Sequence, residues 1–340
     1  MNQACNIVVN KNSIIYEKYT GLSDIKANKP ITQENILAAF SMTKTLTAIA
    51  ILQLVERNKI SIDDRVSKYI EHPYNAEITI RQLLNHTAGI PNPIPLKWVH
   101  LSGEHDIYDE NKALKEVLDK HSELMAEPNT KYIYSNIGYW LLGKIIEKVT
   151  GTKYSSYIKQ NIFEPFDLTE KEIGFVINSN QTKGYLKQWS FMGVLGRFFV
   201  DKNTLGKTEN GWTRVHNVYL NGASFGGAFG SARSFSIILQ DLLSQQSKLL
   251  GEVGKKLLYS QQKVRENNEI DMTLGWHVGQ VDDSRYYYKE GGGAGFHCEM
   301  RIYPKQGVAS VLMVNRTSFN TRKVLTQLDG AFVKKTKYRK

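Results

Sequence analysis

Cysteine is scarce in this chain, and the two that occur, Cys5 and Cys298, exclude several classes of protein. Two cysteines cannot form a disulfide framework, and they have no spacing typical of metal ligands. They could form a single disulfide only if their strands adjoin, so two buried free thiols are the preferred interpretation. The sequence also has no H-E-x-x-H motif and no histidine and acidic cluster of metal-binding type. We therefore expect no metal centre.

Long hydrophobic runs are lacking as well. No apolar stretch approaches the length of a membrane span, and residues 1–10 have neither the basic start nor the apolar core of a signal peptide. As it stands, the sequence predicts a cytoplasmic protein, or an exported protein whose N-terminus has been removed. With 340 residues, of which 41% are hydrophobic and 23% charged, the chain can bury a full core as one large domain or two smaller ones.

Acidic residues are fewer than basic ones, which gives a formal net charge of +11. Five of the basic residues lie at 334–340, directly after a helix predicted at Thr321–Val333. We interpret this basic tail as solvated. Because no nucleic-acid-binding module is recognisable, we expect no specific nucleic-acid partner, but weak attraction to anionic surfaces through the tail.

The most informative segment that is present is Ser41-Met42-Thr43-Lys44. Residues 43–55 are rich in strong helix formers and contain neither glycine nor proline, which predicts a helix that starts here. Residues three apart share a face of a helix, so Lys44 would project beside Ser41. The field of the helix start and burial would lower the lysine pKa, so that it can accept the serine proton. Taken alone, the motif could also be a capped helix with an exposed lysine.

A second segment, Tyr134-Ser135-Asn136, lies before a helix predicted at Gly138–Thr150. A tyrosine beside a lysine ammonium ionises more easily and could pass a proton between nucleophile and leaving group. Asn136 could hold the lysine or a substrate carbonyl. In the alternative interpretation this is a loop in which Ser135 or Asn136 caps the helix, and both can hold at once.

A third segment, residues 289–296, joins strands predicted at Ser284–Tyr288 and Cys298–Tyr303. Lys289 would add positive charge beside the nucleophile, and the glycines after it would let a substrate approach the backbone. A backbone N–H here, with that of Ser41, could form an oxyanion hole. The alternative is a glycine-rich hairpin loop. A dinucleotide-binding fingerprint is excluded, because the glycine spacing does not match G-x-G-x-x-G.

With these three motifs in order, the chain resembles the serine β-lactamase and penicillin-binding-protein superfamily, whose signature combines S-x-x-K with K-T-G. It looks most similar to the class C β-lactamase-like branch, which includes esterases and D-amino-acid peptidases and has Tyr-x-Asn as its second motif. The resemblance extends from about residue 6 to residue 332, and it includes linking segments at residues 54–64, 78–91 and 225–227.

The resemblance implies a role for each motif residue. Ser41 would be the acylated nucleophile, Lys44 its proton-accepting neighbour, Tyr134 the shared acid and base, and Asn136 an orienting amide. Lys289 would be the third-motif lysine. Whether Lys44 or Tyr134 takes the first proton stays open, because coupled groups titrate as a unit.

The third motif departs from the family pattern, since it reads Lys289-Glu290-Gly291 instead of Lys-Thr-Gly. The resemblance places the oxyanion N–H groups at Ser41 and Gly292, with Gly291 and Glu290 beside them in the substrate-binding strand. In β-lactamases the middle hydroxyl helps to bind the carboxylate of the antibiotic, which a glutamate would repel. Alternatively, Glu290 points away, because neighbouring strand residues face opposite sides.

We therefore predict a serine hydrolase that works through a Ser41 acyl-enzyme, without a cofactor, on carboxylic esters or small amides. A β-lactamase or D,D-peptidase that binds penicillin is the second hypothesis, and a non-catalytic scaffold on the same fold is the third. The expected partner is a small-molecule ester, amide or β-lactam-like substrate.

The predicted fold is α/β (α+β), with an antiparallel β-sheet flanked by helices and an inserted, mostly helical domain, as in β-lactamases and transpeptidases. Residues 1–60 and 225–340 would form the sheet domain, residues 61–224 the helical domain, and residues 334–340 the tail. A hairpin and a meander supply the expected strands, at Cys5–Asn10, Ser13–Tyr19, Thr273–Gln280, Ser284–Lys289, Cys298–Tyr303 and Val308–Val314. The three motifs would then meet in an interdomain cleft.

Two further segments have competing interpretations. His86, in Asn-His-Thr-Ala-Gly, could suggest a Ser-His pair, but a structural turn is favoured. The apolar stretch Trp189–Val200, broken by glycines, is interpreted as a helix packed in the insertion. The functional alternative is an apolar lid that favours acyl chains, or an interfacial segment.

Overall fold

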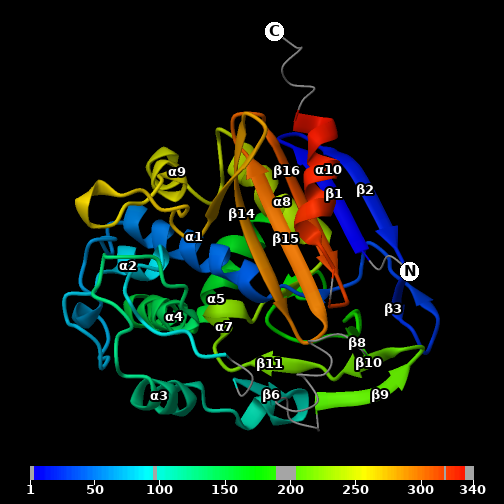
Figure 1. Cartoon of the computed structure of the whole chain (residues 1–340), viewed down its shortest axis with the longest axis horizontal. Coiled ribbons are helices and arrows are strands. Elements are labelled where there is room, and N and C mark those ends of the chain that lie inside the picture. Colours follow the sequence, from blue (N-terminus) through cyan, green and yellow to red (C-terminus); the bar gives the residue numbers. More distant parts are fainter. Residues whose placement is uncertain (1–3, 95–97, 189–203, 318, 334–340) are drawn as a thin grey trace.

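A six-stranded antiparallel sheet joins the two ends of the chain in the computed structural model, which describes residues 4–94, 98–188, 204–317 and 319–333. The strands lie in the order β13-β14-β15-β16-β1-β2 (Figure 1). Their bounds are Ala4–Asn10 for β1, Ile14–Thr20 for β2, His277–Val281 for β13, Ser284–Gly293 for β14, Phe296–Tyr303 for β15 and Val308–Val314 for β16. The N-terminal hairpin thus pairs with the C-terminal meander, through β1 and β16.

Helices cover both faces of this sheet. α8 (Ala232–Leu243) packs on one face against β1 and β16, and α10 (Thr321–Val333) packs on the other face against β15 and β16. Val311 therefore points into the core shared with α8, whereas Leu312 faces α10. A strand that is covered on both faces has a continuous apolar sequence instead of an alternating one, which explains why every residue of β16 is buried.

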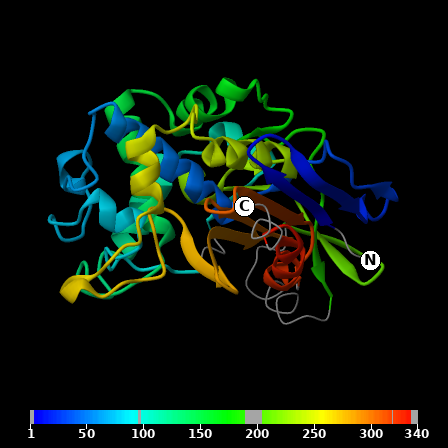
Figure 2. The same cartoon turned by 90° about the horizontal axis from the view of Figure 1, so that it is seen from above.

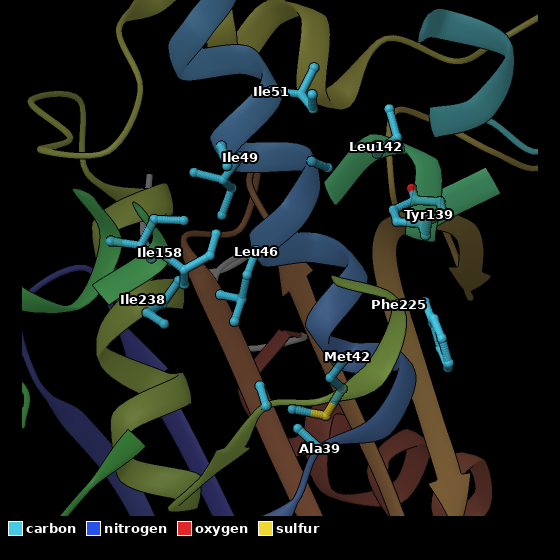
Figure 3. Close-up of a cluster of buried hydrophobic side chains, with 14 of the residues drawn as sticks. Ala39, Met42, Leu46, Ile49, Ile51, Tyr139, Leu142, Ile158, Phe225 and Ile238 are labelled. Carbon is cyan, nitrogen blue, oxygen red and sulfur yellow. The ribbon is translucent and has the colours of Figure 1, made fainter. Parts of the chain in front are cut away.

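The centre of the molecule is α1 (Thr43–Glu56), in which every residue from Thr43 to Leu54 is buried. A helix that is surrounded on all sides needs no polar face. Figure 3 shows Leu46 and Ile49 of this helix pointing toward Ile158 and Ile238. The helices that pack around it are α4 (Asn136–Thr150), α5 (Tyr154–Ile158), α7 (Ala223–Gly226) and α9 (Glu252–Tyr259).

The remaining described α-helices and strands lie around this core, and most of them are short. In chain order they are β3 (Leu22–Asp24), β4 (Lys29–Pro30), β5 (Leu37–Ala38), α2 (Ile80–Leu84), β6 (Val99–Leu101), α3 (Glu110–Lys120), β7 (Ile173–Gly174), β8 (Gly184–Lys187), β9 (Leu205–Glu209), β10 (Trp212–Val215), β11 (Val218–Leu220) and β12 (Phe229–Gly230). The strands form small sheets in the orders β8-β10-β9, β5-β12-β7, β11-β6 and β3-β4. Figure 2 shows the helical region beside the large sheet.

The predicted fold class is confirmed, because an antiparallel sheet carries helices on both faces. The bounds predicted for the strand Val308–Val314 and the helix Thr321–Val333 agree with β16 and α10. The strand predicted at Thr273–Gln280 is wrong at its start. Residues 273–276 form a turn, in which Gly275 has a φ of +92° and Thr273 N–H donates to Trp276 O at 2.8 Å. The strand β13 therefore begins only at His277.

The described helices and strands do not test three further expectations. The division into a sheet domain (residues 1–60 and 225–340) and a helical domain (residues 61–224) remains a prediction. The apolar stretch Trp189–Val200 lies within residues 189–203, and the basic tail is residues 334–340; both lie outside the described part of the chain.

The two cysteines lie in strands that do not adjoin. Cys5 in β1 and Cys298 in β15 are both register partners of Met313, in the strand β16 that separates them. Both are buried free thiols, as the preferred interpretation of the sequence predicts, and a disulfide between them is excluded by the strand order. None of the helices in the described part of the chain combines the length and the hydrophobicity that crossing a lipid bilayer requires.

Candidate active site

Ser41 lies where a tight turn runs directly into the buried helix α1. The turn is a 3-10 helix, Phe40–Met42, and α1 follows it without a break. Phe40 has a φ of +44°, a left-handed conformation that bulky side chains rarely adopt. Ser41 is therefore placed one turn before Lys44, as the S-x-x-K spacing predicts.

The glycine run of β14 lies against this turn. A Cβ atom on Gly291 would lie 2.3 Å from Ala39 O and 2.9 Å from Ser41 N, so a side chain there would push the strand away from the nucleophile. The Sγ of Cys298 lies 3.1 Å from Ala39 O and 3.3 Å from Gly291 O. The thiol thus lies between the nucleophile turn and β14, a contact that sequence analysis missed because a buried thiol carries no motif.

The hydroxyl of Ser41 contacts the other two predicted proton carriers. Its Oγ lies 2.7 Å from the Tyr134 hydroxyl and 3.1 Å from Lys44 Nζ. The structure therefore brings together side chains that are three and 93 positions apart in the sequence. This arrangement allows either partner to exchange a proton with the serine.

Lys44 is fully buried and has three oxygen neighbours. Its Nζ donates to Asn136 Oδ1 at 2.7 Å and to the Phe225 carbonyl of α7 at 2.6 Å, besides the contact with Ser41. Figure 3 shows Phe225 and Tyr139 on the same side of α1, and their rings lie 5.6 and 5.5 Å from Nζ. Asn136 holds the lysine, as one of the predicted alternatives states, whereas the Phe225 carbonyl had no sequence signal.

Lys289 is also fully buried, and its Nζ has no hydrogen-bond partner among the described residues. It lies 5.2 Å from the centre of the Tyr134 ring and 5.9 Å from that of Tyr139. Burial lowers the pKa of Lys289 to about 7. Burial, and then the charge of Lys289, hold the pKa of Lys44 well below its usual range.

Tyr134 precedes the start of α4, whose N-cap is Ser135; the Ser135 hydroxyl accepts a hydrogen bond from Gly138 N–H at 3.1 Å. The predicted cap is thus confirmed. The prediction that a lysine ammonium eases the ionisation of Tyr134 is not supported. Burial raises the pKa of Tyr134, and the hydrogen bond with Ser41 offsets this only in part.

Glu290 lies on the opposite face of β14 from Lys289, and its carboxylate contacts His297 of β15. Glu290 Oε1 lies 2.5 Å from His297 Nε2. The structure therefore favours the alternative in which Glu290 points away from the third-motif lysine. Gly292 follows it on the same strand and is the register partner of His297.

His86 contacts the site without touching the nucleophile. It has a φ of +60°, and its ring lies 4.4 Å from that of Tyr134, while its Nδ1 accepts from Ser135 N–H at 3.1 Å. The favoured interpretation of this segment as a turn agrees with these contacts. Beside it, Tyr132 OH lies 3.1 Å from His277 Nε2, a pair that sequence analysis did not identify. Within the described ranges, no group of three or more histidine, cysteine or acidic residues could hold a metal ion.

The sequence matches a family model described as Beta-lactamase over residues 6–331. Among curated proteins, penicillin-binding protein 4* of Bacillus subtilis (strain 168) is 26% identical over 296 residues, which cover 85% of this chain and 63% of the relative. Protein flp of Staphylococcus aureus (strain MRSA252) is 24% identical over 340 residues, which cover 98% of this chain and 63% of the relative. The chain thus spans less than two thirds of the length of these relatives.

Solved structures with the same fold include an octameric penicillin-binding protein homologue from Pyrococcus abyssi. It has a TM-score of 0.79 at 21% identity and covers 97% of this chain and 73% of its own. D-amino acid amidase from Ochrobactrum anthropi SV3, in complex with L-phenylalanine, has a TM-score of 0.76 at 18% identity and covers 98% and 94%.

Proposed function

Because the chain belongs to the β-lactamase family, a family of serine hydrolases, we propose that it hydrolyses carboxylic esters or small amides through an acyl-enzyme on Ser41. The observation that carries this proposal is the position of the Ser41 hydroxyl, within hydrogen-bond distance of both Lys44 Nζ and Tyr134 OH. A serine that contacts two groups able to accept and return its proton is equipped for nucleophilic catalysis.

We propose that Lys44 takes the first proton, and its hydrogen bonds support this role. A neutral amine has two N–H groups, which Asn136 Oδ1 and the Phe225 carbonyl accept. Its lone pair is then left for the hydroxyl proton of Ser41. The lowered pKa of Lys44 favours the neutral amine, and the raised pKa of Tyr134 favours the protonated phenol.

Acylation then follows with a balanced set of protons. Ser41 Oγ attacks the substrate carbonyl carbon and gives its proton to Lys44. Tyr134 protonates the leaving alkoxide or amine as its bond to the carbonyl carbon breaks, and the proton held by Lys44 then passes to the Tyr134 phenolate, so that both groups regain their starting protonation. In the second half of the reaction, a water molecule attacks the acyl carbonyl carbon and gives a proton to the Lys44–Tyr134 pair. The pair returns a proton to Ser41 Oγ as its bond to the acyl carbon breaks, and the acid is released.

The oxyanion of the tetrahedral intermediate would lie at the start of α1. The backbone N–H groups of Ser41 and Gly292 are its proposed donors, and the close approach of Gly291 to Ser41 N supports this position. Lys289, which is buried beside the Tyr134 ring, would add positive charge when it is protonated. Donors held in place before the reaction stabilise charge that forms only in the transition state.

A second candidate is a β-lactamase or D,D-peptidase, and the relationship to penicillin-binding protein 4* favours it. The fold similarity to D-amino acid amidase is consistent with amide substrates as well. A non-catalytic scaffold is disfavoured, because such a protein needs no buried lysine beside an oriented serine.

The test compares wild type and Ser41→Ala on p-nitrophenyl acetate, p-nitrophenyl butyrate, D-phenylalanine amide and nitrocefin. We expect turnover of the esters or the amide that is lost in the variant, together with loss of fluorophosphonate labelling. Strong nitrocefin turnover would favour the β-lactamase instead. Absence of turnover and of labelling in the wild type would contradict the proposal.

A further inference from the structure

Glu290 and His297 form a partly exposed pair beside the glycine run of β14. Their side chains are 48% and 24% exposed, and Glu290 Oε1 lies 2.5 Å from His297 Nε2. A Cβ atom on Gly292 would lie 3.6 Å from the imidazole ring. The pair therefore borders Gly292, whose backbone N–H we assign to the oxyanion hole, so a substrate that extends past this residue along β14 would come close to the pair.

The hydrogen bonds of His297 determine how many protons this pair holds. Nδ1 lies 2.9 Å from the carbonyl oxygen of Phe319, and a carbonyl only accepts, so Nδ1 must carry a proton. Nε2 faces a carboxyl oxygen, and without a proton between them two lone pairs would face each other. The pair thus holds one proton more than a neutral imidazole and a carboxylate. Its net charge is zero instead of −1.

The surrounding charges favour an imidazolium and a carboxylate. The hydrogen bond from His297 holds the pKa of Glu290 below its usual range, and Arg322 and Arg301 act in the same direction. Burial alone would lower the pKa of His297, but Glu290 outweighs it, with a smaller contribution from Glu299, so that the pKa is raised. As the pH rises through this raised value, His297 loses its proton and Glu290 keeps an unbalanced negative charge.

We propose that the Glu290–His297 pair selects substrates by their charge, and that its protonation changes the selection. With the extra proton the neutral pair tolerates a carboxylate on the substrate. Without it, Glu290 repels such a substrate, and neutral or cationic substrates are preferred. The inference rests on the proposed function, because it requires a substrate bound at Ser41 and Gly292. The glutamate in the third motif is then a pH-dependent barrier to carboxylates and not a permanent one.

The test uses two esters that differ only in charge, meta-acetoxybenzoate and its neutral amide meta-acetoxybenzamide. The kcat/KM value of the charged ester is divided by that of the neutral ester, and this ratio is measured at pH values below, near and above neutrality. In the wild type we expect this ratio to fall by about two- to fivefold as the pH rises, the range of a partly exposed charge interaction. The neutral ester serves as the internal reference at each pH.

Two variants separate the partners. Glu290→Gln should give a higher ratio than the wild type at every pH, because the negative charge is gone, and the remaining change should move to lower pH, because His297 still titrates without its carboxylate partner. His297→Gln should give a low ratio at every pH, because Glu290 stays charged. Glu77→Gln, which removes an exposed carboxylate paired with Arg65, is the matched control and should keep the wild-type profile. A wild-type ratio that stays constant with pH, with both esters hydrolysed, would overturn the proposal.

An NMR titration of His297 keeps the proposal testable whatever the turnover. We expect its pKa to lie above that of an ordinary histidine and to fall in Glu290→Gln. A wild-type pKa equal to that of an ordinary histidine would overturn the proposal that Glu290 and His297 share an extra proton. Failure of the proposed function would be seen separately, as absence of Ser41 labelling by a fluorophosphonate and of hydrolysis of both esters.

Discussion

Two buried clusters of charge lie on opposite faces of β14 and β15, and they are built in opposite ways. In the candidate active site, Lys44 and Lys289 are both fully buried, and neither has a carboxylate partner among the residues that the structure describes. Under α10, Arg301 is equally buried, but its Nε lies 2.6 Å from Glu299 Oε1 and its Nη1 lies 3.4 Å from Asp329 Oδ2.

The difference lies in what each cluster can do. The α10 cluster is compensated: Arg301 also donates to the Arg322 carbonyl at 3.1 Å, and Tyr303 donates to Asp329 at 2.7 Å. Such a network holds a helix on a sheet. Removing one partner destabilises the fold, because the other partner is left as an uncompensated buried charge. In the lysine cluster, the positive charge of a protonated Lys289 has no partner among the described residues, which is unfavourable in the resting protein and becomes favourable when negative charge develops on a substrate. Buried charge without a counterion thus indicates a reactive site, and buried charge with one indicates a structural site.

The largest expected effect is on activity, in Lys44→Met. The variant removes the proposed base, so kcat/KM for the best ester or amide should fall by about a hundredfold to ten-thousandfold. Removal of the neutral amine leaves the Asn136 Oδ1 and Phe225 carbonyl oxygens without their donor, so the free energy of unfolding should fall by no more than about 2 kcal/mol. Lys148→Met, at an exposed position of α4, is the control for loss of a lysine. Activity retained in Lys44→Met would refute the role of this residue.

The next effect is on stability, in Arg301→Met. Glu299 and Asp329 would remain buried without their cation, and we expect the free energy of unfolding to fall by about 3 to 5 kcal/mol in urea titrations. Arg81→Met removes an arginine from an ion pair with Asp63 whose side chains are 34% and 63% exposed, and should cost less than about 1 kcal/mol. Folded Arg301→Met should keep its Ser41 labelling. Equal losses in both arginine variants would contradict the comparison.

The smallest effect is a pH dependence that comes from Asp329. Burial raises the pKa of Asp329 to about 6, although Arg301 and Tyr303 oppose the shift. Folded protein therefore binds the proton more tightly than unfolded protein, and the stabilisation is present at low pH and lost as the pH rises through about 6. Between about pH 4 and pH 6 this carboxyl should contribute a decrease of up to about 3 kcal/mol.

Asp329→Asn isolates this contribution, because the amide keeps the shape of the side chain without the titration. The wild-type free energy of unfolding minus that of the variant should decrease as the pH rises from about 4 to 6 and then become constant. A difference that is independent of pH, or that increases, would show that Asp329 titrates normally.

Local features of the site could be predicted from the sequence because they depend on neighbours along the chain. The distance of three residues places Lys44 beside Ser41 on one helical turn. Ser135 caps α4 through its own backbone neighbours. The continuous apolar sequence of β16 indicates a strand covered on both faces.

Other features depend on residues that are far apart in the sequence. The Phe225 carbonyl binds Lys44, yet every residue has a carbonyl, so no residue type reports it. The sequence leaves the direction of Glu290 open, because strand alternation gives two faces without saying what lies on each. Its contact with His297 comes from the pairing of β14 with β15. The burial of Tyr134, which reverses the expected pKa shift, likewise depends on the elements packed around it.

By itself, the sequence determined which chemical groups this protein has and how they are spaced within each motif, because a helical turn or a strand translates short spacings into geometry. Only the tertiary structure decided which motifs face one another, how deeply Lys44 and Lys289 are buried, and which charges remain without a partner. The physical reason is that solvent exposure and long-range contacts are properties of the packed chain, and these two properties set the pKa values and hydrogen bonds on which the proposed reaction depends.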